Sequence, residues 1–301
     1  MRCETSDIEF PLTLGRDFVG KIVHKGLDIK NSDYQVGDKV WGVIPVHNQG
    51  CHCEYIAIDK CFVSKKPENL SDIDAAAVLY AGLTAWSGLF ITGQLGGVLG
   101  ALCANGGGAG KKVLVLGASG GVGTLAIQML QAEGVEVVVT CGSDAVSLLN
   151  NLGVAKVIDY TSEDSDVILV HESPYDIILD CAGKGTDYAN SLPWTFRTYI
   201  TFNSPLLKNF DSHGLISGGL MNARDLINSN LSALNRNGSV KWGYFLPSPV
   251  GIEYLKKLAE KQKLLPIIHS TFSYEALPEA YQRVQDGHLR GKVVIDYTKT
   301  K

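Results

Sequence analysis

Lys112-Val-Leu-Val-Leu-Gly117-Ala118-Ser119-Gly120-Gly121-Val122-Gly123-Thr-Leu-Ala-Ile-Gln-Met-Leu130 is the stretch that decides the fold. An apolar run typical of a buried strand leads into four glycines within seven residues, and an apolar helix-like segment follows. A strand–turn–helix unit that binds a dinucleotide needs a tight turn, a close approach of backbone to phosphate, and close packing of helix on strand. The helix would present its N–H groups and its positive dipole end to the pyrophosphate.

The glycine pattern departs from the G-x-G-x-x-G form in one place. Ala118 occupies the first glycine position, while Gly120 and Gly123 occupy the second and third. A short pattern of this kind also occurs in glycine-rich turns that bind nothing, so that alternative stays open at this stage.

The sequence after Lys111 alternates between strand-like and helix-like segments. Apolar runs predict strands at 112–116, 135–140, 156–159, 175–180, 197–202 and 239–245, with helices at 117–133, 144–152 and 225–234. Such alternation predicts an α/β fold with a doubly wound parallel sheet, and six strands suffice for a complete dinucleotide-binding (Rossmann) domain. We place this domain at 81–263.

The flanking parts of the chain have a different character. Residues 8–63 contain short strand-like runs with turn residues between them, at 19–23, 39–44 and 54–58, which favours a small barrel or sandwich. Ser71-Asp-Ile-Asp74 resembles a capping box that opens a helix, and a second helix is expected from Leu83 to Ile91. Helices at 251–262 and 277–285 and a strand at 292–297 follow, and we expect the last strand to return to the first domain, so that 1–80 and 264–301 form one unit.

Composition limits the classes of function. A chain of 301 residues predicts about two domains. A net charge of −4 gives no sign of the basic surface that binds nucleic acid or an anionic membrane. Seven scattered cysteines indicate a reduced compartment and no disulfide framework. Met1–Phe10 does not resemble a targeting segment. The uncharged stretch Ala75–Leu102 is long enough to span a bilayer, but its polar residues and glycines favour a buried helix followed by a loop.

Several short motifs occur in a fixed order along nearly the whole chain. They are Gly15-Arg16-Asp17-Phe18-Val-Gly20, Gly37-Asp38-Lys-Val-Trp41, Glu54-Tyr55, Gly82-Leu-Thr-Ala-Trp86, Gly117–Gly123, Val157-Ile-Asp-Tyr160 and Gly287-His-Leu-Arg-Gly-Lys292. Together they resemble the medium-chain dehydrogenase/reductase superfamily, within it the zinc-free quinone oxidoreductases, and most closely the reticulon-interacting mitochondrial oxidoreductases. The resemblance implies a GroES-like substrate domain beside the Rossmann domain. It also implies mitochondrial localisation for the full-length protein, and an upstream targeting segment and first strands that this chain is expected to lack.

The resemblance bears on metal binding. Zinc alcohol dehydrogenases of this superfamily carry Gly-His-Glu where this chain has Gly15-Arg16-Asp17, so the imidazole ligand is missing. Cys51-His52-Cys53 is the remaining candidate. Neighbouring residues of an extended segment point to opposite faces, which suits a tetrahedral zinc site poorly. We predict no metal site.

The end of the second Rossmann strand decides which nicotinamide cofactor binds. An acid at this position would hold the ribose 2′-hydroxyl of NAD, but the chain has Thr140-Cys-Gly-Ser143, which leaves room for a 2′-phosphate. Asp144 is expected to cap the next helix. The resemblance implies that Ser143 and Tyr160 contact the phosphate, so NADPH is the predicted cofactor. An N-cap role for Ser143 and a strand-end role for Tyr160 are the alternatives.

The resemblance assigns the remaining site residues. It implies pyrophosphate contacts from the turn and nicotinamide contacts from residues distant in sequence: Ser119, Gly120, Gly121, Val122, Gly123, Phe202, Tyr244, Phe245, His288, Leu289 and Arg290. Tyr80, Thr84 and Trp86 would line the acceptor pocket. Packing or surface roles are the alternatives for each residue, and no general acid can be identified from the sequence.

The sequence thus predicts an NADPH-dependent enzyme that transfers hydride to a quinone or enone without zinc. An enal or enoyl reductase on the same scaffold is one alternative. A catalytically weak cofactor-binding module that acts through a partner, such as a reticulon-type membrane protein, is another. Whether the chain forms a homodimer stays open.

Overall fold

The computed structural model describes residues 11–97, 107–234 and 238–299. The chain divides into two compact units, one comprising chiefly Thr84–Phe245 and the other Leu12–Leu83 with Leu246–Lys301. The chain passes between them at 83/84, within one helix, and again at 245/246. That the second unit binds substrate stays a prediction.

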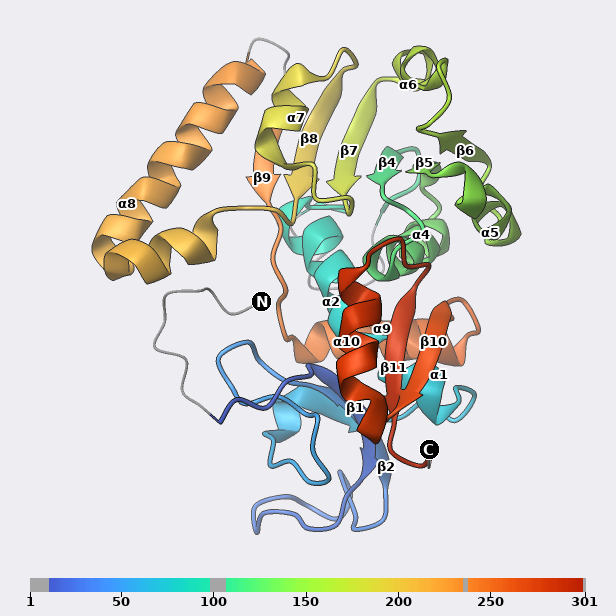
Figure 1. The fold of residues 1–301 in the computed structure, drawn as a ribbon, viewed down its shortest axis with the longest axis vertical. Helices are drawn as coiled ribbons and strands as arrows, with labels where there is room; N and C mark the ends of the chain where they lie inside the picture. Colours follow the sequence, from blue (N-terminus) through green and yellow to red (C-terminus); the bar gives the residue numbers. More distant parts are fainter. Residues whose placement is uncertain (1–10, 98–106, 235–237, 300–301) are drawn as a thin grey trace. The chain divides into compact units, whose positions relative to one another are not determined.

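The first unit is built on one parallel sheet of six strands in the order β6-β5-β4-β7-β8-β9 (Figure 1). The strands are β4 (Lys112–Leu116), β5 (Glu136–Cys141), β6 (Lys156–Asp159), β7 (Tyr175–Asp180), β8 (Phe196–Thr201) and β9 (Ser239–Trp242). Strand order reverses at β4, where the chain first builds outward to β6 and then returns to β7. A dinucleotide binds at such a switch point, outside the carboxyl ends of the strands. The predicted doubly wound α/β fold is confirmed.

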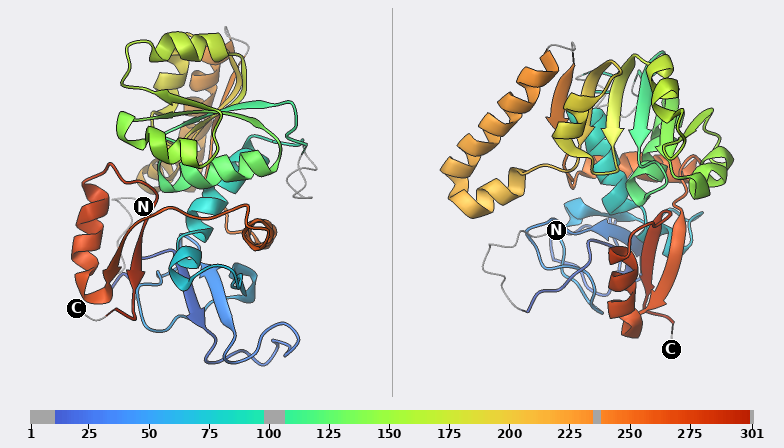
Figure 2. Two further views of the ribbon diagram at one scale, coloured as in Figure 1. Left: turned by 90° about the vertical axis from the view of Figure 1, so that its right-hand side faces the viewer. Right: turned by 45° about the horizontal axis from the view of Figure 1, so that its top comes forward.

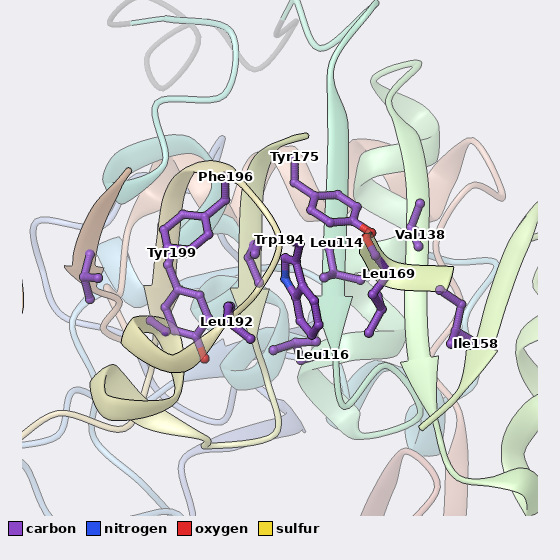
Figure 3. Packing of buried hydrophobic residues seen from close by; sticks show 13 residues of the cluster. Leu114, Leu116, Val138, Ile158, Leu169, Tyr175, Leu192, Trp194, Phe196 and Tyr199 are labelled. Carbon is purple, nitrogen blue, oxygen red and sulfur yellow. Dashed lines mark hydrogen bonds between the residues drawn. The ribbon is translucent and has the colours of Figure 1, made fainter. Parts of the chain in front are cut away.

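Helices cover both faces of this sheet (Figures 1 and 2). They are α2 (Leu79–Trp86), the π-helical segment η2 (Ser87–Thr92), α4 (Gly121–Ala132), the 3₁₀ turn η3 (Ser143–Ala145), α5 (Val146–Asn151), α6 (Ser165–Glu172), α7 (Gly185–Ser191) and α8 (Leu206–Leu234). Right-handed crossovers place α4 and α5 on one face and α7 on the other. The core on the α7 face joins Leu114, Leu116, Val138 and Ile158 of the strands to Trp194 (Figure 3).

The sequence pattern predicts fewer helices than this unit contains. Helices α6 and α7 and most of α8 are absent from the predicted set. Helices α7 and α8 are polar or contain glycine, and the four consecutive apolar residues of α6, Val167–Val170, do not show the spacing of an amphipathic helix. Within α8 the backbone bends at Gly214, whose φ of 73° is the left-handed conformation that glycine tolerates. A Cβ at Gly218 would lie 2.5 Å from the carbonyl oxygen of Asn209, so glycine lets the two segments of α8 pack closely.

A charged cluster lies at the amino edge of the sheet. Lys112 Nζ lies 2.9 Å from carboxylate oxygens of both Glu172 and Glu136, and Lys156 Nζ lies 3.0 Å from Glu172. Hydrogen bonds from Lys112 and Lys156 lower the pKa of Glu172 below its ordinary value of 4.5. The cluster is on the edge opposite to the glycine turn and therefore serves stability.

We expect Glu172→Gln to cost about 1 kcal/mol of unfolding free energy at pH 7, because partly exposed ion pairs are weak. Since the pKa of Glu172 is lowered on folding, its contribution is complete above about pH 4.5 and is lost as pH falls through the folded-state pKa. Urea unfolding at pH 7 and pH 3.5 should show a smaller difference between variant and wild type at the lower pH. Glu253→Gln, at an exposed pair with Lys257, is the matched control and should change little at either pH.

The second unit contains two small sheets. Strands β1 (Asp17–Lys21), β2 (Lys39–Val43) and β3 (Val63–Lys65) are antiparallel, and β10 (Ile268–Ser273) pairs in parallel with β11 (Lys292–Asp296). The helical elements are η1 (Lys60–Phe62), α1 (Asp72–Ala76), α9 (Pro249–Glu260), η4 (Tyr274–Ala276) and α10 (Leu277–Gln285). The Ser71 hydroxyl accepts a hydrogen bond from Asp74 N at 3.0 Å, so the predicted helix cap is confirmed.

One predicted strand of this unit is wrong. Residues 54–58 have the alternation of a strand, but the structure shows irregular backbone there, with Tyr55 73% exposed. Strand β2 pairs with β1 on one side and with β3 on the other. A strand-like pattern forms a strand only where a neighbour takes up its backbone hydrogen bonds, and among the described residues no strand pairs with 54–58.

The uncharged stretch 75–102 begins in the last two residues of α1 and includes α2 and η2, whose apolar side chains are largely buried. Its last residues, 98–102, lie outside the described residues. Among the residues that the structure describes, no helix has the length and apolar character needed to cross a bilayer.

Candidate cofactor site

The turn after β4 needs glycine at two places for steric reasons. Gly117 has a φ of 70°, and a Cβ there would lie 2.8 Å from the backbone nitrogen of Ala182 in the loop after β7. A Cβ at Gly123 would lie 2.7 Å from the Cα and carbonyl oxygen of Ala118. Gly117 therefore permits the turn and its contact with the β7 loop, and Gly123 permits α4 to pack against the end of β4.

Gly120 is different, because the space beside it is open. A Cβ there would meet only the carbonyl oxygen of Gly117, at 3.6 Å, and its φ of −77° suits any residue. Gly120 is the N-cap of α4, and no side chain caps this helix. Helix geometry leaves the first N–H groups, those of Gly121, Val122 and Gly123, without partners inside the helix. An open approach and N–H donors at the positive dipole end fit a pyrophosphate. Ser119, which is buried, completes the turn.

Ser143 and Tyr160 lie at one corner of the carboxyl edge. Tyr160 directly follows β6, and its backbone N–H donates to Cys141 O at 3.0 Å, at the end of the adjacent strand β5. Ser143 begins η3 two residues after Cys141 and is exposed, and the Tyr160 side chain is 57% exposed. The sheet thus brings the two residues to neighbouring strand ends. The predicted cap role of Asp144 is wrong, because Gly142 is the N-cap of η3 and Ala145 that of α5.

Asp180, at the end of β7, organises the next part of this edge. It is fully buried, and its carboxylate accepts hydrogen bonds from the backbone N–H groups of Ala182 (3.2 Å), Lys184 (3.0 Å) and Gly185 (2.8 Å) and from the Thr201 hydroxyl (2.8 Å). The sequence reasoning missed this residue. An acid that ends an apolar strand directly before Cys-Ala-Gly-Lys-Gly was the available signal, since a buried carboxylate needs donors and a glycine-rich loop supplies them.

The Asp180 network reaches two neighbouring segments. Cys181 N donates to Leu116 O at 3.0 Å, which ties the β7 loop to the strand before the glycine turn. Thr201 Oγ1 accepts from Asn203 N at 3.0 Å, and Asn203 Nδ2 donates to Gly183 O at 3.0 Å, which ties the same loop to the end of β8. Burial, reinforced by the Asp180 carboxylate, raises the pKa of the Cys181 thiol. The three central strand ends are therefore held as one hydrogen-bonded edge.

Thr84 and Tyr244 are brought together through Ser87. The Ser87 hydroxyl is buried within hydrogen-bond distance of Thr84 O, at 3.1 Å, and of Tyr244 O. Ser87 begins the π-helical segment η2, and Lys241 Nζ donates to Thr92 O, at 3.1 Å, where that segment ends. Short π-helical segments are rare in proteins as a whole. Those that do occur are frequently found at functional sites. Tyr244 itself is 46% exposed, and Phe245 follows it.

The predicted aromatic residues of this unit differ in accessibility. Space for the Phe202 ring comes from two glycines, since a Cβ at Gly88 would lie 2.8 Å and one at Gly243 2.6 Å from ring carbons. Trp86 is only 2% exposed and packs against Phe90, with ring centroids 6.4 Å apart. Phe202 is thus clamped at the edge of the unit's core, and Trp86 lies within that core.

The other predicted residues belong to the second unit. Tyr80 N donates to Asp17 Oδ2 at 3.1 Å, and burial raises the pKa of the Tyr80 phenol. His288, Leu289 and Arg290 form the connection between α10 and β11, in which His288 has a φ of 51°. Arg290 N donates to His269 Nδ1 at 3.4 Å. Their role toward a cofactor stays a prediction.

The candidate metal donors are engaged in other contacts. Arg16 Nη1 donates to Pro45 O and Asn48 O at 3.0 and 2.9 Å, and the Asp17 carboxylate accepts from Tyr80 N. Burial, and then the Asp17 charge, raises the pKa of Cys51 to about 12, which keeps this thiol protonated and a poor ligand. Among the described residues, no group of three or more metal-ligating side chains is arranged to hold an ion.

Comparison with known proteins supplies the family. The family model described as "Zinc-binding dehydrogenase" matches residues 152–295. The chain is 50% identical over 298 residues to the "NAD(P)H oxidoreductase RTN4IP1, mitochondrial" of Drosophila melanogaster, a match that covers 98% of this chain and 71% of that protein. It is 32% identical to the "Reticulon-4-interacting protein 1, mitochondrial" of Caenorhabditis elegans, covering 98% of this chain and 78% of that protein.

A solved quinone oxidoreductase from Coxiella burnetii has the same fold. It superposes with a TM-score of 0.74 and 26% identity, over 95% of this chain and 80% of that one. The relatives' names specify a nicotinamide cofactor, and the open glycine turn at the switch point of the sheet suits one. The chain therefore belongs to the RTN4IP1 family of NAD(P)H oxidoreductases, within the medium-chain dehydrogenase/reductase superfamily.

Proposed function

We propose that this protein uses NADPH to reduce a quinone or enone without zinc. The observation that carries the proposal is the turn at Gly120, where open space meets the uncapped amino end of α4 at the carboxyl edge of a parallel sheet. When bound, NADPH supplies the hydride from its nicotinamide ring. The chain's own contribution is to bind, to orient and to exclude water.

Each part of the carboxyl edge has a role in this proposal. The N–H groups of Gly121, Val122 and Gly123 hold the pyrophosphate. Asp180 keeps the β7 loop against the glycine turn, and Ser87 fixes the backbone at Thr84 and Tyr244. No described side chain pair suggests a general acid, so we propose that the proton comes from solvent.

The choice of NADPH over NADH rests on the corner formed by Ser143 and Tyr160. Ser143→Asp adds a carboxylate there, which would repel the 2′-phosphate but not a 2′-hydroxyl. We expect the Kd for NADPH to rise about tenfold or more and that for NADH to stay within twofold, measured by titration of nicotinamide fluorescence. Ser147→Asp, at an exposed position in α5, is the matched control. Equal affinity of the wild type for both cofactors would contradict the proposal.

Zinc independence rests on the engaged donors around Asp17 and Cys51. We expect overnight dialysis against EDTA to leave the NADPH oxidation rate unchanged and elemental analysis to find far less than one zinc per chain. A loss of activity that added zinc restores would overturn this part of the proposal.

The acceptor is tested by NADPH oxidation with a panel of quinones, enals and enoyl thioesters. Turnover of quinones or cyclic enones supports the proposal, and faster turnover of enals or thioesters would favour the related reductase. One observation favours a weak catalyst that acts through a partner: Trp86, predicted to line the acceptor pocket, is 2% exposed. Stabilisation by NADPH without turnover of any acceptor would support that candidate.

The names of the relatives support two further proposals, one on localisation and one on a protein partner. We propose that the full-length protein is mitochondrial, as these names state of the relatives. We also propose that a reticulon-type membrane protein binds it, as the name of the nematode relative indicates for that protein. Fractionation of cells and pull-down with the purified protein test these proposals separately.

A further inference from the structure

The connection between α10 and β11 has an unusual backbone. Gly287, His288 and Gly291 have φ angles of 72°, 51° and 80°, all in the left-handed region. Glycine adopts this region freely, but a histidine does so at an energetic cost that its surroundings must offset. A Cβ at Gly291 would lie 2.0 Å from the carbonyl oxygen of Ile267, so the chain there runs directly against the segment before β10. We call residues 287–291 the α10–β11 loop.

Two side chains hold this loop from neighbouring elements. Helix α10 lies beside strands β10 and β11 (Figures 1 and 2). Arg283 of α10 donates through Nη1 to Gly287 O at 2.9 Å, where the loop begins. Its Nη2 lies 2.9 Å from Nε2 of His269 on β10, and Nδ1 of the same imidazole lies 3.4 Å from Arg290 N. The imidazole thus connects the helix to the far end of the loop, and we call His269 and Arg283 the loop clip.

The contacts of the loop clip require a neutral imidazole. Arginine is not deprotonated in proteins, so the Arg283 guanidinium can only donate. Each neutral tautomer of His269 has one acceptor nitrogen, and it therefore accepts either from Arg283 or from the Arg290 N–H. In the protonated ring both nitrogens carry hydrogen, and N–H groups then face N–H groups on both sides.

The charges around the ring favour the neutral form as well. Partial burial, followed by the positive charges of Arg283 on α10 and Arg290 in the loop, lowers the pKa of His269 below its ordinary value of 6.5. Lys292 of the adjacent strand β11 lies against Asp17 instead, with 3.7 Å between its Nζ and the carboxylate. A proton on His269 therefore adds a third positive charge beside two arginines.

We propose that the loop clip positions the α10–β11 loop for cofactor binding and releases it in mild acid. The proposal rests on the predicted contact of His288, Leu289 and Arg290 with NADPH. In an opened loop the imidazole returns toward its ordinary pKa of 6.5, so the open state takes up protons that the closed state does not. Closure is therefore complete above about pH 7 and weakens as the pH falls below 6.5. Release also relieves the left-handed conformation of His288.

Hydrogen exchange tests the loop clip without any cofactor. Peptides that cover residues 286–292 are followed by mass spectrometry at pH 7.5 and pH 5.5, and the rates are corrected for the intrinsic pH dependence of exchange. We expect the corrected rate of the wild type to be about threefold higher or more at pH 5.5. His269→Glu should exchange slowly at both pH values, because a carboxylate accepts from Arg283 throughout this range. His269→Leu should exchange quickly at both, and His24→Glu, at an exposed site of the same unit, should behave like the wild type.

Binding of NADP⁺ measures the consequence for the cofactor, since the reduced form decomposes in acid. The 2′-phosphate of NADP⁺ takes up a proton near pH 6, and this changes its affinity for every variant alike. His269→Glu is therefore the reference for the wild type. Titration calorimetry should show a Kd that rises about threefold more between pH 7.5 and pH 5.5 in the wild type than in His269→Glu.

The outcomes separate the loop clip from the proposed function. Equal corrected exchange at the two pH values in the wild type, or the same pH dependence in His269→Glu, would overturn the clip. Loop opening in acid with no difference in Kd between the wild type and His269→Glu would overturn its role in cofactor binding. Absence of NADP⁺ binding at pH 7.5 would refute the proposed function and the positioning role together, whereas hydrogen exchange would still decide on the clip. His269→Glu carries the test if His269→Leu does not fold.

Discussion

Asp180→Ala is expected to lower the unfolding free energy by about 3–5 kcal/mol and to weaken NADPH binding at least tenfold. The substitution leaves the N–H groups of Ala182, Lys184 and Gly185 and the Thr201 hydroxyl without their acceptor. Each buried donor that loses its partner costs about 1–3 kcal/mol, and the exposed part of the loop recovers some of this by binding water. Urea unfolding and fluorescence titration with NADPH measure the two effects.

The loss of affinity follows from what the loop supports. The β7 loop contacts the glycine turn at Gly117, where backbone atoms of Ala182 fill the space that a side chain would need, and Cys181 N bonds to Leu116 O. A loop that loses its carboxylate anchor no longer fixes that turn. Asp180→Asn, which keeps the shape but turns an amide donor toward one pair of donors, should fall between wild type and alanine in both measurements.

Asp176→Asn is the matched control for this prediction. Asp176 lies at the other end of β7, and its carboxylate accepts a hydrogen bond from Lys112 N at 2.9 Å. We expect a stability loss of about 1 kcal/mol and an unchanged affinity for NADPH. If Asp176→Asn weakens NADPH binding as much as Asp180→Ala does, the effect of Asp180 is global destabilisation and not support of the cofactor edge.

The hydrophobic periodicity of the sequence predicts strands and helices correctly where the local preference of a segment agrees with its packing in the fold. The four central strands β4, β5, β7 and β8 are largely buried, and the predicted strands of the six-stranded sheet match the observed ones to within about three residues. Helix α4 is mostly apolar and was equally recognisable. The strand predicted at 54–58 failed because alternation indicates a pleat but says nothing about whether a neighbouring strand is available.

The parts that sequence reasoning missed depend on contacts between distant residues. Helix α8 is held by asparagine side chains and contains glycines, so only its last part, 225–234, was predicted as a helix from the sequence. Asp180 is informative only once the fold shows that four donors converge on its carboxylate. Gly120 and Gly123 look equivalent in the sequence, yet the structure gives one of them open space and the other none.

Because of this difference, substitutions at Gly120 and Gly123 distinguish an effect on cofactor binding from an effect on folding. In Gly120→Ala the new methyl group makes only an ordinary contact with Gly117 O, at 3.6 Å, and the backbone conformation suits alanine. A poorer N-cap and a less flexible unfolded chain have opposite effects of about 1 kcal/mol or less, so stability should change little. The methyl group nevertheless occupies the approach to the N–H groups of α4. We expect the Kd for NADPH to rise about tenfold or more, equivalent to about 1.4 kcal/mol.

Gly123→Ala should instead damage both properties. Its methyl group would lie 2.7 Å from backbone atoms of Gly117 and Ala118, which cannot move without shifting α4 or the end of β4. We expect a loss of about 1–3 kcal/mol in unfolding free energy, as for other overpacked cores, together with loss of measurable NADPH binding. Gly107→Ala, where nothing lies within 4 Å, is the control and should match the wild type. Normal NADPH binding by Gly120→Ala, together with loss of binding by Gly123→Ala, would contradict this prediction. The turn would then only connect β4 to α4, and the pyrophosphate would have to be held elsewhere on the carboxyl edge.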